Sequence, residues 1–203
     1  MSETTTIIDI IRHGEPEGGS KYRGQVDDPL SERGWAQVRA AVAGRDGWQQ
    51  IVTSDLSRCA AFAEEVGQRL AIPVERTDQF REIGFGDWEG MTAREIMAQD
   101  EAALAAFWQD PLNNTPPNAE PLADFYRRIE SAWEGILDNH AGKHILLVGH
   151  AGMMRVLLLK ALGMGLEGFY RFDPRNATIV RIRVDSGRHG EAYSQLVFEG
   201  PAI

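Results

Sequence analysis

The chain has 203 residues, of which 43% are hydrophobic and 25% charged, the usual balance of a water-soluble globular protein. Its 21 basic and 30 acidic residues give a formal charge of −9, which argues against nucleic acid or an anionic membrane as partners. The single cysteine, Cys59, excludes an internal disulfide, and no signal peptide or membrane-spanning apolar segment is recognisable. We therefore expect a cytoplasmic protein in which any anion site is built locally from clustered arginines.

Short apolar strands alternate with helical patterns along the chain, which is typical of an α/β protein. In the first half, the sequence predicts a helix over Ser31–Gly44 with Ser31 as its N-cap. The other predicted elements of this half are strands at Ile7–Ile11, Ile51–Thr53 and Pro73–Thr77, and a helix that is entered through Ser54–Ser57 and runs to about Leu70.

The second half continues the alternation. Thr92 and Glu95 have the spacing of a capping box, which opens a further helix, whereas the prolines and asparagines of Pro111–Pro121 indicate a loop. The remaining predicted elements are a helix over Leu122–His140, a strand over Ile145–Val148, a helix over Met153–Leu162, and a hairpin of Thr178–Val184 and Ala192–Phe198 around Asp185-Ser186-Gly187. We expect one domain, residues 1–203, with a mainly parallel sheet and ligands at the carboxyl ends of its strands.

Residues 91–121 are expected to form a helical and loop cap over the ligand site. Phe107 and Trp108 of this segment, and Trp88 before it, could stack on a substrate base or pack in the core, and packing is the commoner fate. The sequence does not decide whether the segment closes over a substrate.

The tripeptide Arg12-His13-Gly14 lies at the end of the first predicted strand. A neutral imidazole can attack phosphorus and hold a phosphoryl group covalently, which divides one difficult step into two. Arg12 offers a planar fork for phosphate oxygens, and Gly14 lets the backbone turn sharply and approach a ligand. The alternative for an isolated His13 is a strand-end histidine held by a backbone carbonyl.

Two further residues follow predicted strands. Arg58 falls in the first turn of a helix, where the helix dipole disfavours a cation, so a bound anion would resolve the conflict. Its alternative is a salt bridge to a nearby carboxylate. His150 follows the strand Ile145–Val148 and could stabilise a phosphoryl group in its trigonal-bipyramidal state, or it could be a hydrogen-bonded core histidine.

A leaving alkoxide needs a proton donor, and the segment Arg81–Gly90 contains three carboxylates besides its arginine: Glu82, Asp87 and Glu89. The glycines and aromatic residues of this segment suggest a shaped loop. These residues alone do not decide among the three carboxylates, and a solvated loop carboxylate is the alternative for each.

Taken together, these motifs resemble the histidine phosphatase superfamily, also called the phosphoglycerate mutase-like family. The resemblance covers nearly the whole chain, because the motifs occur in the expected order. The segments concerned are Arg12–Pro16, Asp27–Gly34, Ser54–Arg58, Glu82–Gly90 and Val148–Gly152.

This resemblance implies a three-layer α/β sandwich, with a mainly parallel sheet flanked by helices. It also implies a phosphomonoesterase that needs no metal or other cofactor and acts on a small-molecule phosphate ester. His13 would be the phosphorylated nucleophile and Glu82 the proton donor. Arg12, Arg58 and His150 would complete the phosphate pocket.

Within the family, the likeness is closest to the α-ribazole phosphatase branch, which serves cobalamin assembly, on the segments Glu17–Gly24 and Arg58–Glu64. The chain departs from the wider family at Gly19, where an Asn usually helps to hold phosphate, and Arg23 is a candidate to replace that contact. Another departure is Asn118–Pro121, which stands where a Gly-Gly-Glu-Ser stretch is usual. We expect α-ribazole phosphate as the substrate, with a broad-specificity or sugar-phosphate histidine phosphatase as the alternative.

Two other functions fit less well. Mutases of this family are usually longer and have extra segments over the site. A phospho-ligand binding module that has lost catalysis should lack His13, Arg58 or His150, and all three are present. The sequence leaves the oligomeric state open between a monomer and a homodimer.

Five other residues have no part in this chemistry. Cys59 is expected to pack in the core, and His140, His144 and His189 are expected at the surface, because they match no motif and no metal-ligand spacing. Asp9 lies inside an apolar strand, and the sequence does not explain it.

Overall fold

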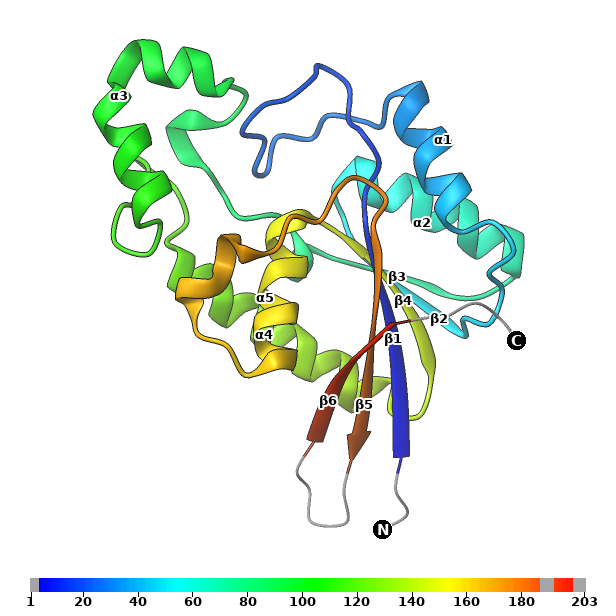
Figure 1. Ribbon diagram of the computed structural model, residues 1–203. Coiled ribbons are helices and arrows are strands. Elements are labelled where there is room, and N and C mark those ends of the chain that lie inside the picture. Colours follow the sequence, from blue (N-terminus) through cyan, green and yellow to red (C-terminus); the bar gives the residue numbers. More distant parts are fainter. Residues whose placement is uncertain (1–3, 187–191, 199–203) are drawn as a thin grey trace.

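The computed structural model describes residues 4–186 and 192–198. Its centre is a six-stranded sheet with the order β3-β2-β4-β1-β5-β6 (Figure 1). The parallel part consists of β3 (Val74–Thr77), β2 (Gln50–Ser54), β4 (His144–Gly149) and β1 (Thr4–Arg12). An antiparallel hairpin of β5 (Ile179–Ser186) and β6 (Ala192–Val197) extends the sheet beside β1. The predicted sheet, mainly parallel, is confirmed.

Helices cover both faces of the sheet (Figure 1). On one face lie α4 (Leu122–Asn139) and α5 (Ala151–Leu162), and on the other lie α1 (Glu32–Ala41) and α2 (Ser57–Leu70). The predicted three-layer α/β sandwich is therefore confirmed. No helix in the described part of the chain is long and apolar enough to cross a membrane.

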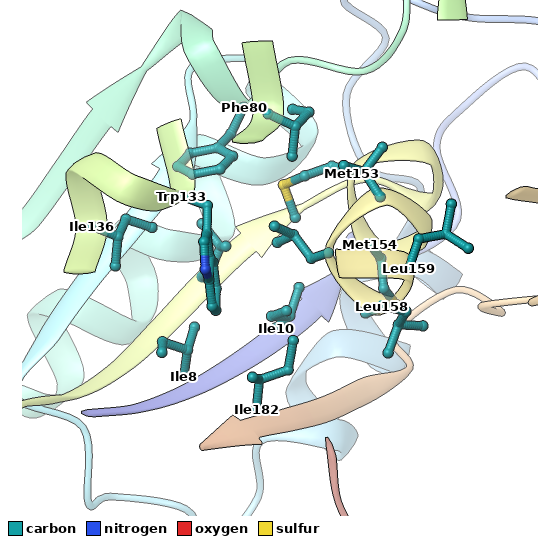
Figure 2. Packing of buried hydrophobic residues seen from close by; sticks show 14 of the residues in the cluster. Ile8, Ile10, Phe80, Trp133, Ile136, Met153, Met154, Leu158, Leu159 and Ile182 are labelled. Carbon is teal, nitrogen blue, oxygen red and sulfur yellow. The ribbon is translucent and has the colours of Figure 1, made fainter. Parts of the chain in front are cut away.

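The larger core lies between the sheet and the pair α4 and α5. Ile8 and Ile10 of β1 pack there with Trp133 of α4 and Met154 of α5 (Figure 2). Ile11 packs in the second core, on the α1 and α2 side, because successive side chains of a strand point to opposite faces. Each such buried aliphatic side chain stabilises the fold by about 1.5–3 kcal/mol. Both faces therefore fix the position of β1, and with it the residues at the end of β1.

Helix ends follow the sequence signals closely. The Ser31 hydroxyl caps α1 by accepting a hydrogen bond from a backbone amide of the first turn, as predicted. The predicted capping box of Thr92 and Glu95 opens α3 (Ala93–Gln109). The helix is interrupted at Asp100, whose φ of −154° and ψ of 89° are non-helical. The Asp100 carboxylate then caps the turn that follows, so α3 consists of two short helices in series.

The predicted hairpin near the end of the chain is present, but its turn lies further along. Asp185 and Ser186 belong to β5 and pair with Tyr193 and Ala192 of β6. The last residue of the predicted turn, Gly187, lies outside the described residues. In the described part of the chain, the connections also contain three 3-10 helices: η1 (Asp78–Phe80), η2 (Gly86–Trp88) and η3 (Leu166–Arg171).

Asp9 has a clear structural role. Its carboxylate is 1% exposed and accepts hydrogen bonds from Trp48 Nε1 (2.8 Å), His144 Nε2 (2.9 Å) and Arg181 Nε (2.6 Å). Burial opposes the charged carboxylate, but the hydrogen bonds from Arg181, His144 and Trp48 overcome it and hold the pKa of Asp9 well below its ordinary value. Asp9 thus ties β4 and β5 to β1.

The extra histidines were expected at the surface, but two of them are only partly exposed. His144 is partly buried because its ring bonds to Asp9, and His140 is partly buried with its Nε2 3.2 Å from a carboxylate oxygen of Glu75. In each case a carboxylate elsewhere in the chain holds the imidazole against the protein. His189 lies outside the described residues.

Helix α3 stands apart from the sheet (Figure 1) and has a small core of its own. Trp88 and Phe107 are buried in this core, and the ring of Tyr22, from the loop after β1, contacts both edge to face at centroid distances of 5.7 and 6.4 Å. Trp88 and Phe107 therefore pack in a core, the commoner of the two fates expected for them. Trp108 is 52% exposed.

Candidate active site

His13 and His150 lie side by side at the ends of neighbouring parallel strands. Arg12 and Gly149 are paired in the β1–β4 register, and the His13 amide donates to the Gly149 carbonyl (2.9 Å). The two imidazole centroids are 5.2 Å apart, with His13 5% exposed and His150 fully buried. The sheet topology therefore brings together two histidines that are far apart in the sequence.

His13 is held in one tautomer by the residue that follows it. Its Nδ1 lies 2.7 Å from the Gly14 carbonyl oxygen, which can only accept, so Nδ1 carries the proton. Nε2 is then unprotonated, and it makes no hydrogen bond with any described residue. Burial, together with Arg12 and Arg58, lowers the pKa of His13 well below its ordinary value. At neutral pH the imidazole is uncharged, and its Nε2 lone pair is available.

Only a glycine fits after His13. A Cβ on Gly14 would lie 2.1 Å from the carbonyl oxygen of Gly34 in α1, which is far inside contact distance. The chain after His13 can therefore pack this closely against α1 only because residue 14 has no side chain.

His150 is the N-cap residue of α5 and is enclosed by α2 and β2. Its Nε2 lies 2.9 Å from Ser54 Oγ and 3.6 Å from Cys59 Sγ. Burial, followed by the charge of Arg58, lowers the pKa of His150 well below its ordinary value. Cys59 is buried, as predicted, and burial raises the pKa of its thiol to about 12, so it stays a neutral packing group.

The buried Arg58 and the partly buried Arg12 provide positive charge beside the histidines. Arg58 is 1% exposed and donates to the backbone carbonyls of Val26 (2.6 Å) and Gly24 (2.8 Å). Arg12 donates to the carbonyl of Pro174 (2.7 Å). Within the described ranges neither arginine forms an ion pair, so the alternative of a salt bridge for Arg58 is not observed there. The buried Nε atoms of both have no described hydrogen-bond partner. Because buried charge is costly without a counter-charge, this arrangement suits a bound anion.

Glu82 occupies the amino end of α5, close to His150. Both of its carboxylate oxygens lie 3.1 Å from the Gly152 amide nitrogen, and one accepts from its neighbour Ile83 (3.0 Å). A Cβ on Gly152 would lie 2.2 Å from Glu82, so a glycine is needed for this approach. Helix amides favour a carboxylate at this position.

The other two carboxylates of the loop have different surroundings. Glu89 accepts hydrogen bonds from the backbone amides of Gln25 (2.9 Å) and Phe85 (3.0 Å), and so joins two loops. Asp87 is exposed and accepts from Asn118 (3.0 Å). Of the three candidates, only Glu82 lies at the end of α5 next to His150.

The segment Asn118–Pro121 anchors the Glu82 loop. Glu120 and Gly84 are joined by two hydrogen bonds, from the Glu120 amide to the Gly84 carbonyl (2.9 Å) and from the Gly84 amide to the Glu120 carboxylate (3.2 Å). Arg128 of α4 pairs with the same carboxylate at 2.8 Å. The Glu82 loop is thereby fixed against α4.

A cavity of about 410 Å³ opens beside these groups. Its lining residues include both charged and aromatic side chains: Arg12, Ser20, Lys21, Tyr22, Glu82, Phe85, Ala93, Trp108, Ala151, Arg155 and Tyr170. Sequence reasoning did not find Lys21, Tyr170 or Arg155. A signal existed for Arg155, since it and Lys160 are the two charged residues of the otherwise apolar helix α5.

Arg23, the candidate replacement for a phosphate-holding Asn, does not line this cavity. Its Nε pairs with Asp28 (3.0 Å), and its Nη2 donates to the carbonyls of Glu17 and Gly19. These contacts organise the loop after β1. Among the described residues, no group of three or more His, Cys, Asp or Glu side chains is arranged to hold a metal ion.

Fold and site together define a class: an α/β protein whose candidate anion site, at the carboxyl ends of parallel strands, combines two uncharged histidines with two arginines that pair with no carboxylate of the described residues. The chain belongs to the histidine phosphatase superfamily. The family profile for branch 1 of that superfamily matches residues 8–193.

Several relatives are similar over most of this chain. A bifunctional protein of Mycobacterium tuberculosis is 34% identical over 173 residues, which cover 83% of this chain and 47% of that protein. The chain therefore spans about half the length of its mycobacterial relative. Phosphoserine phosphatase 1 of Hydrogenobacter thermophilus is 28% identical over 184 residues, 89% of this chain and 87% of the relative. An adenosylcobalamin/alpha-ribazole phosphatase of Escherichia coli is 28% identical over 167 residues, 80% and 82% of the two chains.

A solved structure from Bacillus stearothermophilus, YhfR, has the same fold. It superposes with a TM-score of 0.85 and 28% sequence identity, and the match covers 98% of both chains.

Proposed function

We propose that the protein hydrolyses phosphate monoesters through a phosphohistidine intermediate on His13. The observation that carries this proposal is the pair of uncharged imidazoles, 5.2 Å apart, beside the buried Arg58 and the partly buried Arg12, which have no carboxylate partner in the described part of the chain. Membership of the histidine phosphatase superfamily supports it.

In the first step, Arg12 and Arg58 hold the phosphate dianion. Nε2 of His13 attacks phosphorus, and the bond between phosphorus and the ester oxygen breaks. Glu82, protonated in the complex, gives its proton to the departing alkoxide. His150 stabilises the phosphoryl group as it moves from the ester oxygen to Nε2 of His13.

In the second step, the phosphoryl group leaves His13. A water molecule gives a proton to the Glu82 carboxylate and attacks phosphorus, and the bond between phosphorus and Nε2 breaks. Inorganic phosphate departs, His13 is again neutral and Glu82 is again protonated. The cycle needs no group beyond the side chains of the site and water. Residues 91–121, with Trp108 at the cavity wall, cap the site of this single catalytic domain.

Two candidate substrates are supported by different observations. The sequence resemblance leads to α-ribazole phosphate, and the Escherichia coli relative of that name supports it. A phosphate ester that also carries a carboxylate is the second candidate. It is favoured by the cations Lys21 and Arg155 of the cavity, which form no ion pair with a described carboxylate.

The reaction is tested by phosphate release in the presence of EDTA from α-ribazole phosphate, 3-phosphoglycerate and 4-nitrophenyl phosphate. We expect His13→Ala to abolish release from every ester, whereas the matched control His140→Ala retains it. The wild-type protein should take up labelled phosphate in an acid-labile, base-stable form, which His13→Ala should not. Turnover that survives in His13→Ala, or a label on another residue, would exclude the mechanism.

A further inference from the structure

The two ring nitrogens of His150 have different surroundings. Its Nε2 lies 2.9 Å from Ser54 Oγ, and both side chains are fully buried. Its Nδ1 has the Cys59 sulfur 3.9 Å away and forms no hydrogen bond with a nitrogen or oxygen atom of residues 4–186 and 192–198. One nitrogen is thus bound inside the protein, and the other is left for a ligand.

The sheet places Ser54 and His13 on opposite sides of His150. Ser54 ends β2, His13 follows β1, and β4, which leads into His150, lies between these two strands. The rings of His13 and His150 meet edge to face, at an interplanar angle of 65°. Because Nε2 of His150 is turned toward β2, Nδ1 is the nitrogen that remains for a phosphoryl group bound beside His13.

The number of protons on His150 restricts what the ring can do. Burial and Arg58 lower its pKa, so the imidazole is uncharged at neutral pH and has one N–H group and one lone pair. A phosphoryl oxygen accepts hydrogen bonds, so His150 stabilises it only when Nδ1 carries the proton. A lone pair on Nδ1 would instead repel the phosphoryl oxygens. Nε2 must therefore be the acceptor of the ring.

The Ser54 hydroxyl is suited to donate to this acceptor. The Leu56 amide donates to Ser54 Oγ at 3.4 Å, which leaves the hydroxyl proton for Nε2. The Cys59 thiol, 3.6 Å from Nε2, donates instead to the Gly149 carbonyl (3.5 Å), and a thiol is a weak donor. A hydroxyl at position 54 thus favours the tautomer of His150 that has its proton on Nδ1.

We propose that Ser54 is a positioning residue, whose Oγ–H group donates to Nε2 of His150 and so holds the Nδ1–H group of that ring ready for the phosphoryl group. Ser54 acts through His150 and does not itself bind the substrate. This inference rests on the proposed phosphatase reaction and adds to it how an uncharged His150 donates to phosphate. His13 and His150 then share one tautomer but have opposite roles, since His13 presents its lone pair and His150 its proton.

NMR of the imidazole ¹⁵N nuclei tests the tautomer directly. In the protein saturated with inorganic phosphate at pH 7, His150 should have a protonated, pyrrole-type Nδ1 and an unprotonated, pyridine-type Nε2. The spectrum of His150→Ala assigns both signals. In Ser54→Ala the Nε2 signal should move toward that of a pyridine-type nitrogen without a hydrogen bond. A proton on Nε2 in the wild-type protein would overturn the inference.

Kinetics test whether the hydroxyl matters for the reaction. Ser54→Ala should lower kcat about tenfold, the effect of one hydrogen bond, and equally for 4-nitrophenyl phosphate and an alkyl phosphate, because His150 acts on the phosphoryl group and not on the leaving group. Ser54→Thr keeps the hydroxyl and should retain most of the activity. Cys59→Ala is the matched control, since it also removes an atom that contacts the His150 ring, and it should lose far less activity.

A double-mutant cycle separates a role through His150 from a role in the fold. In a His150→Ala background, Ser54→Ala should have no further effect on kcat, because the partner of the hydroxyl is absent. The same loss in both backgrounds would mean that the hydroxyl only supports β2, and the inference would be wrong. Thermal unfolding of each variant shows whether it is folded.

The outcomes also separate this inference from the phosphatase reaction. His13-dependent hydrolysis at equal rates in Ser54→Ala and Cys59→Ala would refute the role of Ser54 and leave the reaction intact. If no ester is hydrolysed, the reaction fails, and binding of orthovanadate, which adopts the trigonal-bipyramidal geometry of the transition state, still tests Ser54. Ser54→Ala should bind orthovanadate about tenfold more weakly than Cys59→Ala. Equal affinities would refute the role of Ser54.

Discussion

The Nδ1–H group of His13 donates to the carbonyl oxygen of Gly14, 2.7 Å away, so the imidazole is oriented by its own neighbour in the chain. Gly14 itself packs so closely against Gly34 of α1 that no other residue fits at its position. The tautomer and the direction of Nε2 are thus fixed before any ligand binds, which lowers the cost of ordering the nucleophile.

The first prediction concerns the charge of His13. Burial, Arg12 and Arg58 lower its pKa, so the free imidazole should stay uncharged as the pH falls through 6.5, the ordinary value for histidine. Two-dimensional NMR of imidazole ¹⁵N and ¹H between pH 5 and 8 should give a His13 signal that does not titrate near 6.5 and that carries its proton on Nδ1. The His13→Ala spectrum assigns the signal. Titration of His13 near 6.5 would contradict the expected environment.

The second prediction separates the role of Glu82 from that of its neighbours. Glu82→Gln keeps an oxygen that can accept from the Gly152 amide but removes the proton donor. The rate for an alkyl phosphate, a poor leaving group, should fall about 10²–10⁴-fold, and the rate for 4-nitrophenyl phosphate much less. Asp87→Asn, at an exposed position in the same loop, should change neither rate appreciably. Equal losses on both esters in Glu82→Gln would exclude Glu82 as the acid.

The third prediction addresses the buried charge of Arg58. Arg58→Lys keeps a positive charge but cannot donate to both Val26 and Gly24 while also reaching a phosphate. The inhibition constant of inorganic phosphate should rise about 10–100-fold, which corresponds to the loss of one or two charge-assisted hydrogen bonds. Arg39→Lys, at a surface pair with Glu65, is the control and should bind phosphate like the wild type. A phosphate affinity within twofold of wild type in Arg58→Lys would mean that Arg58 does not bind the phosphate.

The fourth prediction tests the role of Asp9 in stability. Asp9→Asn leaves the neighbouring Arg181 without its buried carboxylate partner, and loss of one member of such a pair costs about 3–5 kcal/mol. Urea unfolding at pH 7 should show this loss. Asp185→Asn, which breaks an exposed pair with Arg183 on β5, should cost far less. A similar small loss in both variants would mean that the network around Asp9 contributes little.

The difference in unfolding free energy between the wild type and Asp9→Asn should also depend on pH, and the lowered pKa of Asp9 sets the direction. The pKa of folded Asp9 lies below the ordinary value of 3.8, so its contribution to stability is present above that value. The contribution is lost as the pH falls from 3.8 toward the folded pKa. The difference in unfolding free energy between wild type and Asp9→Asn should therefore be constant between pH 7 and about 5 and shrink below about 4.

Most of the fold could be predicted from local patterns. The apolar run of Ile7–Ile11 and the capping signals of Ser31 and Thr92 correspond to elements whose ends lie within a few residues of the predicted ones. The interruption of α3 at Asp100 could not be predicted, because the apolar spacing on its two sides is compatible with one helix. The role of Asp9 could not be predicted from the sequence for a different reason: its partners come from a loop and from two other strands.

The site was predictable to the extent that its residues lie at strand ends or in motifs. His13 and His150 follow apolar runs, and the structure brings them together because β1 and β4 are neighbours. Lys21 and Arg155 were missed: Arg155 stands out as a charge in an apolar helix, but the local sequence of neither residue shows that it shares a cavity with Arg12. An unpaired charge can be recognised only when the positions of all the described carboxylates are known.

The strand order also bears on how the protein is made. In the sheet, β4 lies between β1 and β2, although it is synthesised about 90 residues after β2. While the chain emerges from the ribosome, β1 and β2 have exposed edges that only β4 fills, and such edges are prone to pair with other chains. The two histidines cannot meet until that insertion occurs. A truncated product that ends before residue 144 would therefore lack the site altogether and keep two open edges at the centre of its sheet.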